Sequence, residues 1–249
     1  MNERLRTSMA RQAITVDVVA SHAEVDPKTV QRWLAGRTPH ARHRCAVAAL
    51  LDEDEPYLWP ETVTTRPSAS AAELVALYGH RADVPFDLWW QLFEHAQQHI
   101  DVLVYAAPFL HEQYPMLNSL LAERCTHGCS VRVALGDPDC QAVRNRGSEE
   151  AFGEGIESRC RMAQRHFRPL VGKARFELRL HRSTLYNSIY RFDSQILVNI
   201  HIWGANAYSA PVLHLRQVQG GSLFAAFASS FESVWAAAVA VELPTVASS

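Results

Sequence analysis

Three polar side chains near the start of the chain have the types and the spacing that suit contacts with nucleic-acid bases. Lys28, Gln31 and Arg32 lie in the stretch DPKTVQRWLAGR, at 26–37, and share one side of it if the stretch is helical. Lysine and arginine can donate to O6 and N7 of guanine, and glutamine can bond adenine through two atoms. The stretch therefore predicts a surface that contacts base edges in a DNA groove.

A second group of polar residues lies in the back two-thirds of the chain, on predicted strands and on the loops after them. Ligands of layered α/β domains bind beyond the carboxyl ends of strands. The side chains that could bind a phosphate-bearing or other polar small molecule there are Asp137, Asp139, Arg144, Arg146, Tyr186, Ser188, Asp193 and His201. Other interpretations stay open: core packing for Tyr186, a turn for Asp193, a hydrogen-bonded core position for His201, and solvent exposure for the two arginines.

The elements that must position the first group are short helices, predicted over 2–13, 14–25, 27–34 and 40–51. Asp26 is a suitable N-cap for the third helix, Pro27 suits its first turn, and Gly36 ends it. Thr29 is expected on the same outer side of this helix, and Thr29 and Arg37 could donate to phosphate oxygens.

The front of the chain is basic although the whole chain is not. The 249 residues carry a formal net charge of −2, whereas residues 1–51 contain eight basic and four acidic residues, a net charge of +4. A local surplus of positive charge is the electrostatic footprint of a segment that binds nucleic acid. The remainder of the chain has no such surplus.

The stretch VDPKTVQRWLAGR, with VVASHAEV before it and PHARHRCAVAALL after it, resembles the Cro/C1-type helix-turn-helix repressors, the XRE family. The resemblance covers about 60 residues and implies that helix 27–34 enters the major groove of DNA. It implies six DNA-binding residues: Lys28, Gln31 and Arg32 on bases, and Thr29, Arg37 and Arg44 on the backbone. Pro27 departs from the family pattern, because a polar base reader is expected at this first helical position.

A boundary follows the basic segment. The stretch YLWPETVTTRPSASAAEL, at 57–74, gathers prolines and small polar residues, which are typical of linkers. We predict a helix-turn-helix DNA-binding domain over 1–60, a linker over 61–73 and a second domain over 74–249.

The second domain alternates apolar runs with helical patterns. Strands are predicted over 100–107, 130–137, 174–181, 184–193, 194–204 and 211–218, and helices over 87–99, 114–128, 147–167 and 222–238. This order predicts an α/β layered domain whose sheet is covered on both faces. The whole chain would then be an α+β multidomain protein with an all-α bundle in front.

The stretches VRVALGDPD and TLYNSIYRFDSQILVN resemble the phospholipase D superfamily. Its sequence signature, H-x-K-x-x-x-x-D, supplies a nucleophilic histidine, a lysine that neutralises the phosphate and an aspartate that orients a histidine. Alignment on Asp193 puts Tyr186 at the histidine position and Ser188 at the lysine position, and no histidine in the chain has a lysine two residues later. The resemblance therefore implies a retained fold that is not catalytic.

Several classes of site and location are not expected. The five cysteines match no zinc-ligand spacing, so we expect no metal, and no cofactor is indicated. The chain has no signal peptide and no run of the roughly 18 apolar residues that a membrane span needs, which favours a cytoplasmic protein. Two lysines against 22 arginines suggest an actinobacterium-like genome.

These features together favour a transcriptional regulator, not an enzyme. We expect it to bind a double-stranded DNA operator as a homodimer, because one such module makes too few contacts for high specificity. The second domain would sense a small-molecule effector, dimerise, or do both. Two alternatives stay open: a phosphodiesterase or nuclease with an atypical site, and an adaptor whose helical front binds a protein.

Overall fold

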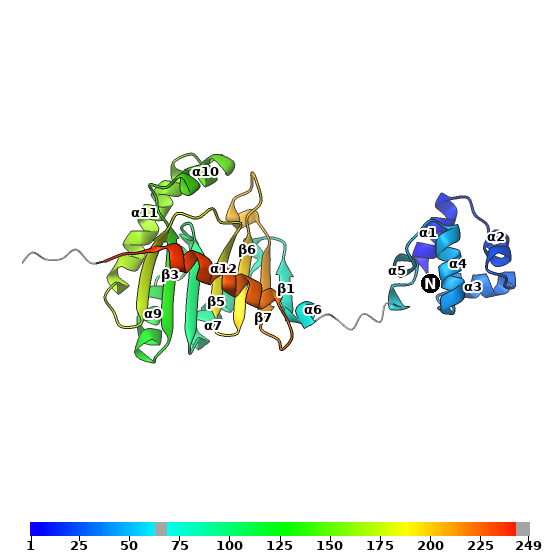
Figure 1. Cartoon of the computed structure of the whole chain (residues 1–249), viewed down its shortest axis with the longest axis horizontal. Coiled ribbons are helices and arrows are strands. Elements are labelled where there is room, and N and C mark those ends of the chain that lie inside the picture. The colour runs from blue at the N-terminus through cyan, green and yellow to red at the C-terminus, as the bar shows by residue number, and fades with distance from the viewer. Residues whose placement is uncertain (63–68, 243–249) are drawn as a thin grey trace, which may run out of the picture. The chain divides into compact units, whose positions relative to one another are not determined.

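The structure, a computed structural model, describes residues 1–62 and 69–242. The chain divides into two compact units between Arg66 and Pro67 (Figure 1). This division falls inside the predicted linker, of which residues 63–68 lie outside the described part. The described parts of that stretch are helical: the 3₁₀ helix η1 (Pro60–Thr62) on one side and α6 (Ala69–Glu73) on the other.

The first unit is all-helical, as the sequence predicts. Its helices are α1 (Glu3–Arg11), α2 (Val16–His22), α3 (Pro27–Leu34), α4 (Ala41–Leu50) and α5 (Glu55–Leu58). Side-chain oxygens of Asn2, Thr15 and Asp26 accept hydrogen bonds from the first-turn amides of α1, α2 and α3, which fixes where each helix begins. The fully buried side chains of Leu58 and Trp59 belong to the same core as these helices, which closes the bundle.

The second unit is built on one eight-stranded sheet in the order β1-β7-β6-β5-β2-β3-β4-β8. The strands are β1 (Leu74–Tyr78), β2 (His99–Val104), β3 (Ser130–Gly136), β4 (Phe176–His181), β5 (Asn187–Phe192), β6 (Gln195–Ile200), β7 (Val212–Arg216) and β8 (Val239–Ala240). Strands β2, β3 and β4 are parallel, and the other pairs are antiparallel. β1 and β8 were not predicted from the sequence.

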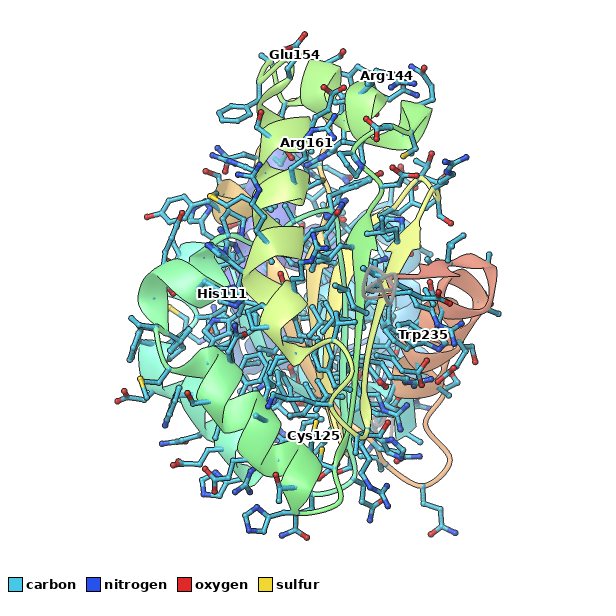
Figure 2. The ribbon with its side chains drawn as sticks, turned by 90° about the vertical axis from the view of Figure 1, so that its left-hand side faces the viewer. His111, Cys125, Arg144, Glu154, Arg161 and Trp235 are labelled. Carbon is cyan, nitrogen blue, oxygen red and sulfur yellow. The ribbon has the colours of Figure 1, made fainter. Side chains whose placement is uncertain are left out.

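Helices cover both faces of this sheet, which confirms the predicted α/β layered class. They are α7 (Phe86–His95), α8 (Phe109–Gln113), α9 (Leu117–Thr126), α10 (Gln141–Glu149), α11 (Gly155–Phe167) and α12 (Leu223–Ala237), with 3₁₀ turns η2 (Arg81–Asp83), η3 (Arg168–Leu170) and η4 (Ala207–Ser209). Figure 2 shows α9 and α11 on one side of the strands and α12, which carries Trp235, on the other.

The prediction of a single helix over 147–167 is wrong. The helix α10 begins before this stretch and ends at Glu149, and a separate helix, α11, begins at Gly155. The break between them needs left-handed backbone, with φ of +53° at Ala151 and +54° at Gly153. Glycine adopts this conformation without a steric penalty, so Gly153 permits the reversal that separates the helices. The second helix begins near the carboxyl end of β2, where Cys160 donates to the Tyr105 carbonyl, and runs back beside the sheet.

Glu73 ties the start of the second unit to its last long helix. Its fully buried carboxylate accepts hydrogen bonds from the amides of Leu223 and Phe224, at 2.7 and 3.1 Å, at the first turn of α12. A carboxylate is stabilised there by the unpaired amides of the helix N-terminus. Glu73 was predicted to lie in the linker, but it is part of the packed second unit.

No helix in the described residues has both the length and the apolar character needed to cross a bilayer.

Candidate functional site

The turn between α2 and α3 orients α3 against the bundle. Glu24 has φ of +53°, and the Asp26 carboxylate accepts from the Lys28 amide at 2.8 Å, so the chain reverses and α3 begins at Pro27. The side chains of Val30 and Trp33 are buried, at 0% and 3% exposure, and fix which side of α3 faces the core.

The opposite side of α3 carries the predicted base-reading residues. At about 100° per residue, Lys28, Gln31 and Arg32 lie across the helix from the buried pair. All three are exposed, and their side chains make no hydrogen bond or ion pair within the described residues. Thr29 is half-buried at the edge of this face. The sequence thus places three free donors on one exposed helical surface, which we call the α3 face.

The two arginines predicted to hold phosphate have different surroundings. Arg37 is exposed, and its side chain has no partner in the described part of the chain. The Arg44 guanidinium donates to Glu55 at 2.6 Å and to the Pro39 carbonyl at 2.8 Å, and only 17% of its side chain is exposed. Arg44 therefore fastens α4 to α5, so its guanidinium is already engaged within the first unit.

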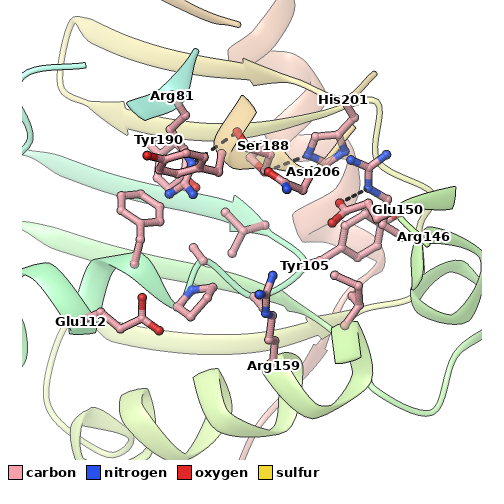
Figure 3. Close-up of a pocket in the computed structure, with 18 of the residues that line it drawn as sticks. Arg81, Tyr105, Glu112, Arg146, Glu150, Arg159, Ser188, Tyr190, His201 and Asn206 are labelled. Atoms are coloured by element: carbon pink, nitrogen blue, oxygen red, sulfur yellow. Dashed lines mark hydrogen bonds and ion pairs between the residues drawn. The ribbon is translucent and has the colours of Figure 1, made fainter. Parts of the chain in front are cut away.

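The second unit contains a cavity of about 360 Å³ at the carboxyl end of β2 (Figure 3). The loop after β2 forms its floor, from Val104 to Phe109, and β5 contributes Ser188 and Tyr190. Side chains from helices and turns complete the wall: Arg81, Glu112, Arg146, Glu150, Ile156, Arg159, His201, Asn206 and Tyr208. The cavity lies where ligands of α/β sheets bind.

Arg146 is a buried cation that is already neutralised. Its side chain pairs with Glu150 at 2.7 Å and with Glu149 at 3.2 Å, and it donates to the Ala205 carbonyl at 2.9 Å. With 3% exposure, these contacts satisfy the charge without a ligand. Arg146 therefore shapes the cavity wall more than it offers a free charge.

Arg81 and Arg159 line the same cavity without a carboxylate partner among the described residues. The Arg81 guanidinium lies 3.9 Å from the centre of the Phe109 ring, and the Arg159 guanidinium lies 4.1 Å from that of Phe152. Burial lowers the pKa of Arg81 below its ordinary value. Contact with the rings restrains both guanidinium groups. Arg81 Nε also donates to the Ala207 carbonyl, at 3.4 Å, so only its terminal NH₂ groups have no hydrogen-bond partner within the described residues.

Ser188 and His201 form a hydrogen-bonded pair in the cavity wall. His201 Nδ1 lies 3.1 Å from the Leu185 carbonyl, which can only accept, so Nδ1 carries the proton. Nε2 of the neutral ring then accepts from the Ser188 hydroxyl, at 3.0 Å. Burial, followed by the charge of Arg146, lowers the pKa of His201 to about 4. The ring is thus neutral near pH 7 and is a weak base.

Tyr190 adds an inert wall to this part of the cavity. Burial raises the pKa of Tyr190 to about 12, so the phenol stays protonated. Its ring packs edge-on against Trp89, with centroids 4.8 Å apart.

Three of the eight predicted ligand-binding residues line the cavity, namely Arg146, Ser188 and His201. The other five do not line it. Asp137 pairs with Arg182 and Asp139 with Arg161, each at 2.8 Å, on the loop after β3.

Arg144, Tyr186 and Asp193 also lie outside the cavity. Arg144 is exposed and donates to the Asp139 carbonyl at 2.9 Å, and Tyr186 is 80% exposed. Asp193, with φ of +51°, forms the turn between β5 and β6. Burial would raise the pKa of Asp193, but hydrogen bonds from the amides of residues 97–99 lower it. The turn interpretation therefore fits Asp193.

Sequence reasoning missed Arg81, Glu112, Arg159, Tyr190 and Tyr208 as cavity residues. A signal for part of the cavity was present, because the stretch AAPF leaves the carboxyl end of β2, just as GDPD leaves that of β3. Arg81 and Arg159 gave no local signal, since they reach the cavity from segments far apart in the chain.

No described cluster of histidine, cysteine, aspartate or glutamate side chains could hold a metal ion. Burial raises the pKa of the Cys129 and Cys160 thiols to about 12, so both stay protonated.

No protein-family model and no curated protein matches the chain significantly. Among solved structures, the chain is similar to TrmBL2, an archaeal chromatin protein with "a novel mode of DNA binding", at 14% identity and a TM-score of 0.45, over 87% of this chain and 72% of that one. It is similar to Nuc, a phospholipase D family member from Salmonella typhimurium, at 10% identity and a TM-score of 0.38, over 68% and 99%.

A third similar structure is the phosphatidylserine synthase of Haemophilus influenzae Rd KW20, at 15% identity and a TM-score of 0.43. The match covers 66% of this chain and 38% of that enzyme. At these identities and TM-scores, the likenesses establish neither a family nor a function for this chain.

Proposed function

We propose that the protein is a transcriptional regulator whose first unit is a helix-turn-helix domain of the Cro/C1 type and binds duplex DNA through the α3 face. One observation carries this proposal: Lys28, Gln31 and Arg32 are exposed and unpaired on the side of α3 opposite its buried residues, Val30 and Trp33. An exposed helical row of unpaired donors suits the major groove. A DNA partner would place the protein in the cytoplasm of a bacterium.

The test is selection of bound duplexes from a random pool, followed by titration of the recovered sequence. Arg32→Ala is expected to relax base preference, whereas Arg37→Ala is expected to weaken binding to all sequences alike. The affinity for the selected duplex should fall steeply as salt rises, because bound cations release counterions from DNA. A front unit that serves as a protein adaptor would show neither selection nor this salt dependence.

The second unit is proposed to be a non-catalytic, phospholipase D-like domain that binds an effector and pairs two chains. Support for pairing comes from β1, an edge strand in which Leu74, Val75 and Leu77 are 44%, 49% and 62% exposed. An apolar edge strand with unpaired backbone groups invites a further strand. Since α6 leads directly into β1, the chain enters the second unit at this edge.

Sedimentation velocity of the full chain tests the pairing. We expect a dimer, and Leu77→Lys should shift the population toward the monomer because it puts a charge on the proposed interface. The exposed Val239, on the opposite edge strand, offers a matched control in Val239→Lys, which should leave the dimer intact. A monomeric wild-type protein at micromolar concentration would contradict the pairing.

A phosphodiesterase is the second candidate, because Ser188 donates to the neutral His201 ring as a nucleophile donates to its base. Two features argue against catalysis. A pKa near 4 makes His201 a weak base, and a backbone carbonyl, not a carboxylate, holds its Nδ1. Ser188 is also only 5% exposed.

Hydrolysis of bis(p-nitrophenyl) phosphate separates the two candidates. We expect no turnover above background for the wild type. Turnover that Ser188→Ala abolishes would instead establish the enzyme.

A further inference from the structure

We propose that the cavity binds a small organic acid, with its carboxylate between Arg81 and Arg159 and a flat apolar ring beside Phe109 and Tyr190. This inference rests on the proposed role of the second unit as an effector domain and names the class of effector. Figure 3 shows Arg81 and Arg159 entering the cavity from opposite sides, with Tyr190 near Arg81.

The charge inside the cavity favours an anion. Arg146 and Glu150 pair with each other, so this cation is already compensated. Arg81 and Arg159 then face a single unpaired carboxylate, that of Glu112, within the described lining. The negative charge of Glu112 raises the pKa of Arg81, and the positive charge of Arg159 lowers it. The three groups therefore interact electrostatically. One anionic group would balance the remaining positive charge.

The two free arginines are fixed in advance, which suits bidentate recognition. The Phe109 ring and the Ala207 carbonyl restrain the Arg81 guanidinium, and the Phe152 ring restrains that of Arg159. The terminal NH₂ groups of both arginines make no hydrogen bond within the described residues. A carboxylate accepts two parallel N–H bonds from such a guanidinium. Arg81 also loses solvent by burial, as the lowered pKa indicates, so an anion there would restore an interaction that water no longer supplies.

The rest of the wall suits a ring more than a chain of hydroxyl groups. Val104, Ala106, Pro108, Phe109 and Ile156 are apolar and line the same cavity as Tyr190. Aromatic side chains favour offset or edge contacts with another ring.

The size of the cavity limits the ligand. Its volume, about 360 Å³, is near the lower end of the range for small-molecule sites. One ring with a short acidic substituent fits that scale. Inorganic phosphate would satisfy the charge but would leave the apolar part of the cavity unfilled.

Isothermal titration of the full chain tests the proposal, with benzoate as the probe and benzylamine and inorganic phosphate as comparison ligands. Benzoate should bind, benzylamine should not, and phosphate should bind at least about tenfold more weakly than benzoate because it buries no apolar surface. Arg159→Gln and Arg81→Gln should each weaken benzoate binding about tenfold or more, because each removes a charge-assisted contact.

Arg144→Gln is the matched control, because Arg144 is exposed on α10 and does not line the cavity. It should leave benzoate binding unchanged. Arg159→Gln keeps the test valid if Arg81→Gln fails to fold. The inference is overturned if benzoate and benzylamine bind equally, if benzoate does not bind at millimolar concentration, or if Arg159→Gln and Arg144→Gln behave alike.

Failure of this inference and failure of the proposed function give different results. A protein that selects a DNA sequence but ignores benzoate contradicts only the effector class. A protein that binds benzoate through Arg159 but selects no DNA contradicts the regulator and leaves the cavity assignment standing.

Discussion

Arg32 on the α3 face and Arg81 beside the cavity are the same residue type in opposite surroundings. Arg32 is exposed and has no side-chain partner in the described residues, whereas Arg81 is partly buried and stacked on Phe109. Free, hydrated cations suit a polyanion that offers many equivalent phosphates, and fixed, desolvated ones suit a single small anion. One chain thus carries two kinds of arginine, each suited to a different class of anion.

The largest effect is expected at a buried charge of the second unit. Asp101 is 0% exposed, and Arg132 bonds its two oxygens at 2.7 and 2.9 Å while also reaching Glu232 on α12. Arg132→Ala should lower the free energy of unfolding by about 3–5 kcal/mol, because it leaves a buried carboxylate poorly paired. Arg32→Ala should change stability by less than about 0.5 kcal/mol.

Calorimetry that resolves the unfolding of each unit measures both variants. If the two changes cost the same, the contrast between exposed and buried arginines is lost.

The next effect is a pH dependence of the stability of the second unit. The pKa of His201 in the folded state is about 4, below its ordinary value of 6.5. Below pH 6.5 the unfolded chain takes up a proton that the folded chain does not. The free energy of unfolding should therefore decrease as the pH is lowered from about 6.5 to about 4. The loss should reach roughly 3 kcal/mol.

Burial also lowers the pKa of His111, His181 and His214 in this unit, so His201→Gln should make the slope shallower without removing it. Denaturant titration at several pH values measures the slope. His95→Gln, at an exposed position on α7, is the matched control and should keep the slope. A slope as steep in His201→Gln as in the wild type would show that His201 does not contribute to it.

A smaller effect is expected on DNA affinity. Arg32→Ala should weaken binding to the selected duplex by about 10- to 100-fold while leaving non-specific binding nearly unchanged. Fluorescence anisotropy with selected and scrambled duplexes measures both quantities. Equal losses on the two duplexes would show that Arg32 holds the backbone and does not read bases.

The smallest effect is expected where sequence reasoning put ligand contacts that the fold does not bring into the cavity. Asp139→Asn removes an ion pair between exposed side chains, Asp139 and Arg161, and should alter neither DNA binding nor benzoate binding measurably. A change in benzoate affinity would draw the binding site toward the loop after β3.

Local signals account for what the sequence could predict. The N-caps Asp26 and Thr15 and the apolar spacing of α3 act within one helical turn, so the helices and the α3 face could be predicted from neighbouring residues. The class of the second unit followed from the alternation of strands and helices. The ion pair of Arg44 could not be predicted in this way, because its partner Glu55 lies on the next helix, outside the local pattern.

The cavity could be predicted only in part for the same physical reason. Ser188 and His201 were found because they lie on predicted strands, but Arg81 and Tyr208 reach the cavity from turns 127 residues apart in the chain. Asp193 was predicted as a ligand-binding residue from its position in a motif, and a motif gives no information on backbone conformation. Its left-handed turn puts the carboxylate on the amides of residues 97–99, away from the cavity.

Titration of a selected duplex at several salt concentrations shows whether the α3 face is the DNA-binding surface. It compares the wild type with a Lys28→Ala/Gln31→Ala/Arg32→Ala variant. We expect the logarithm of the wild-type binding constant to fall linearly with the logarithm of salt, and the variant to lose sequence preference and to show a shallower slope. If the variant selects and binds the duplex as the wild type does, the α3 face is not the DNA-binding surface.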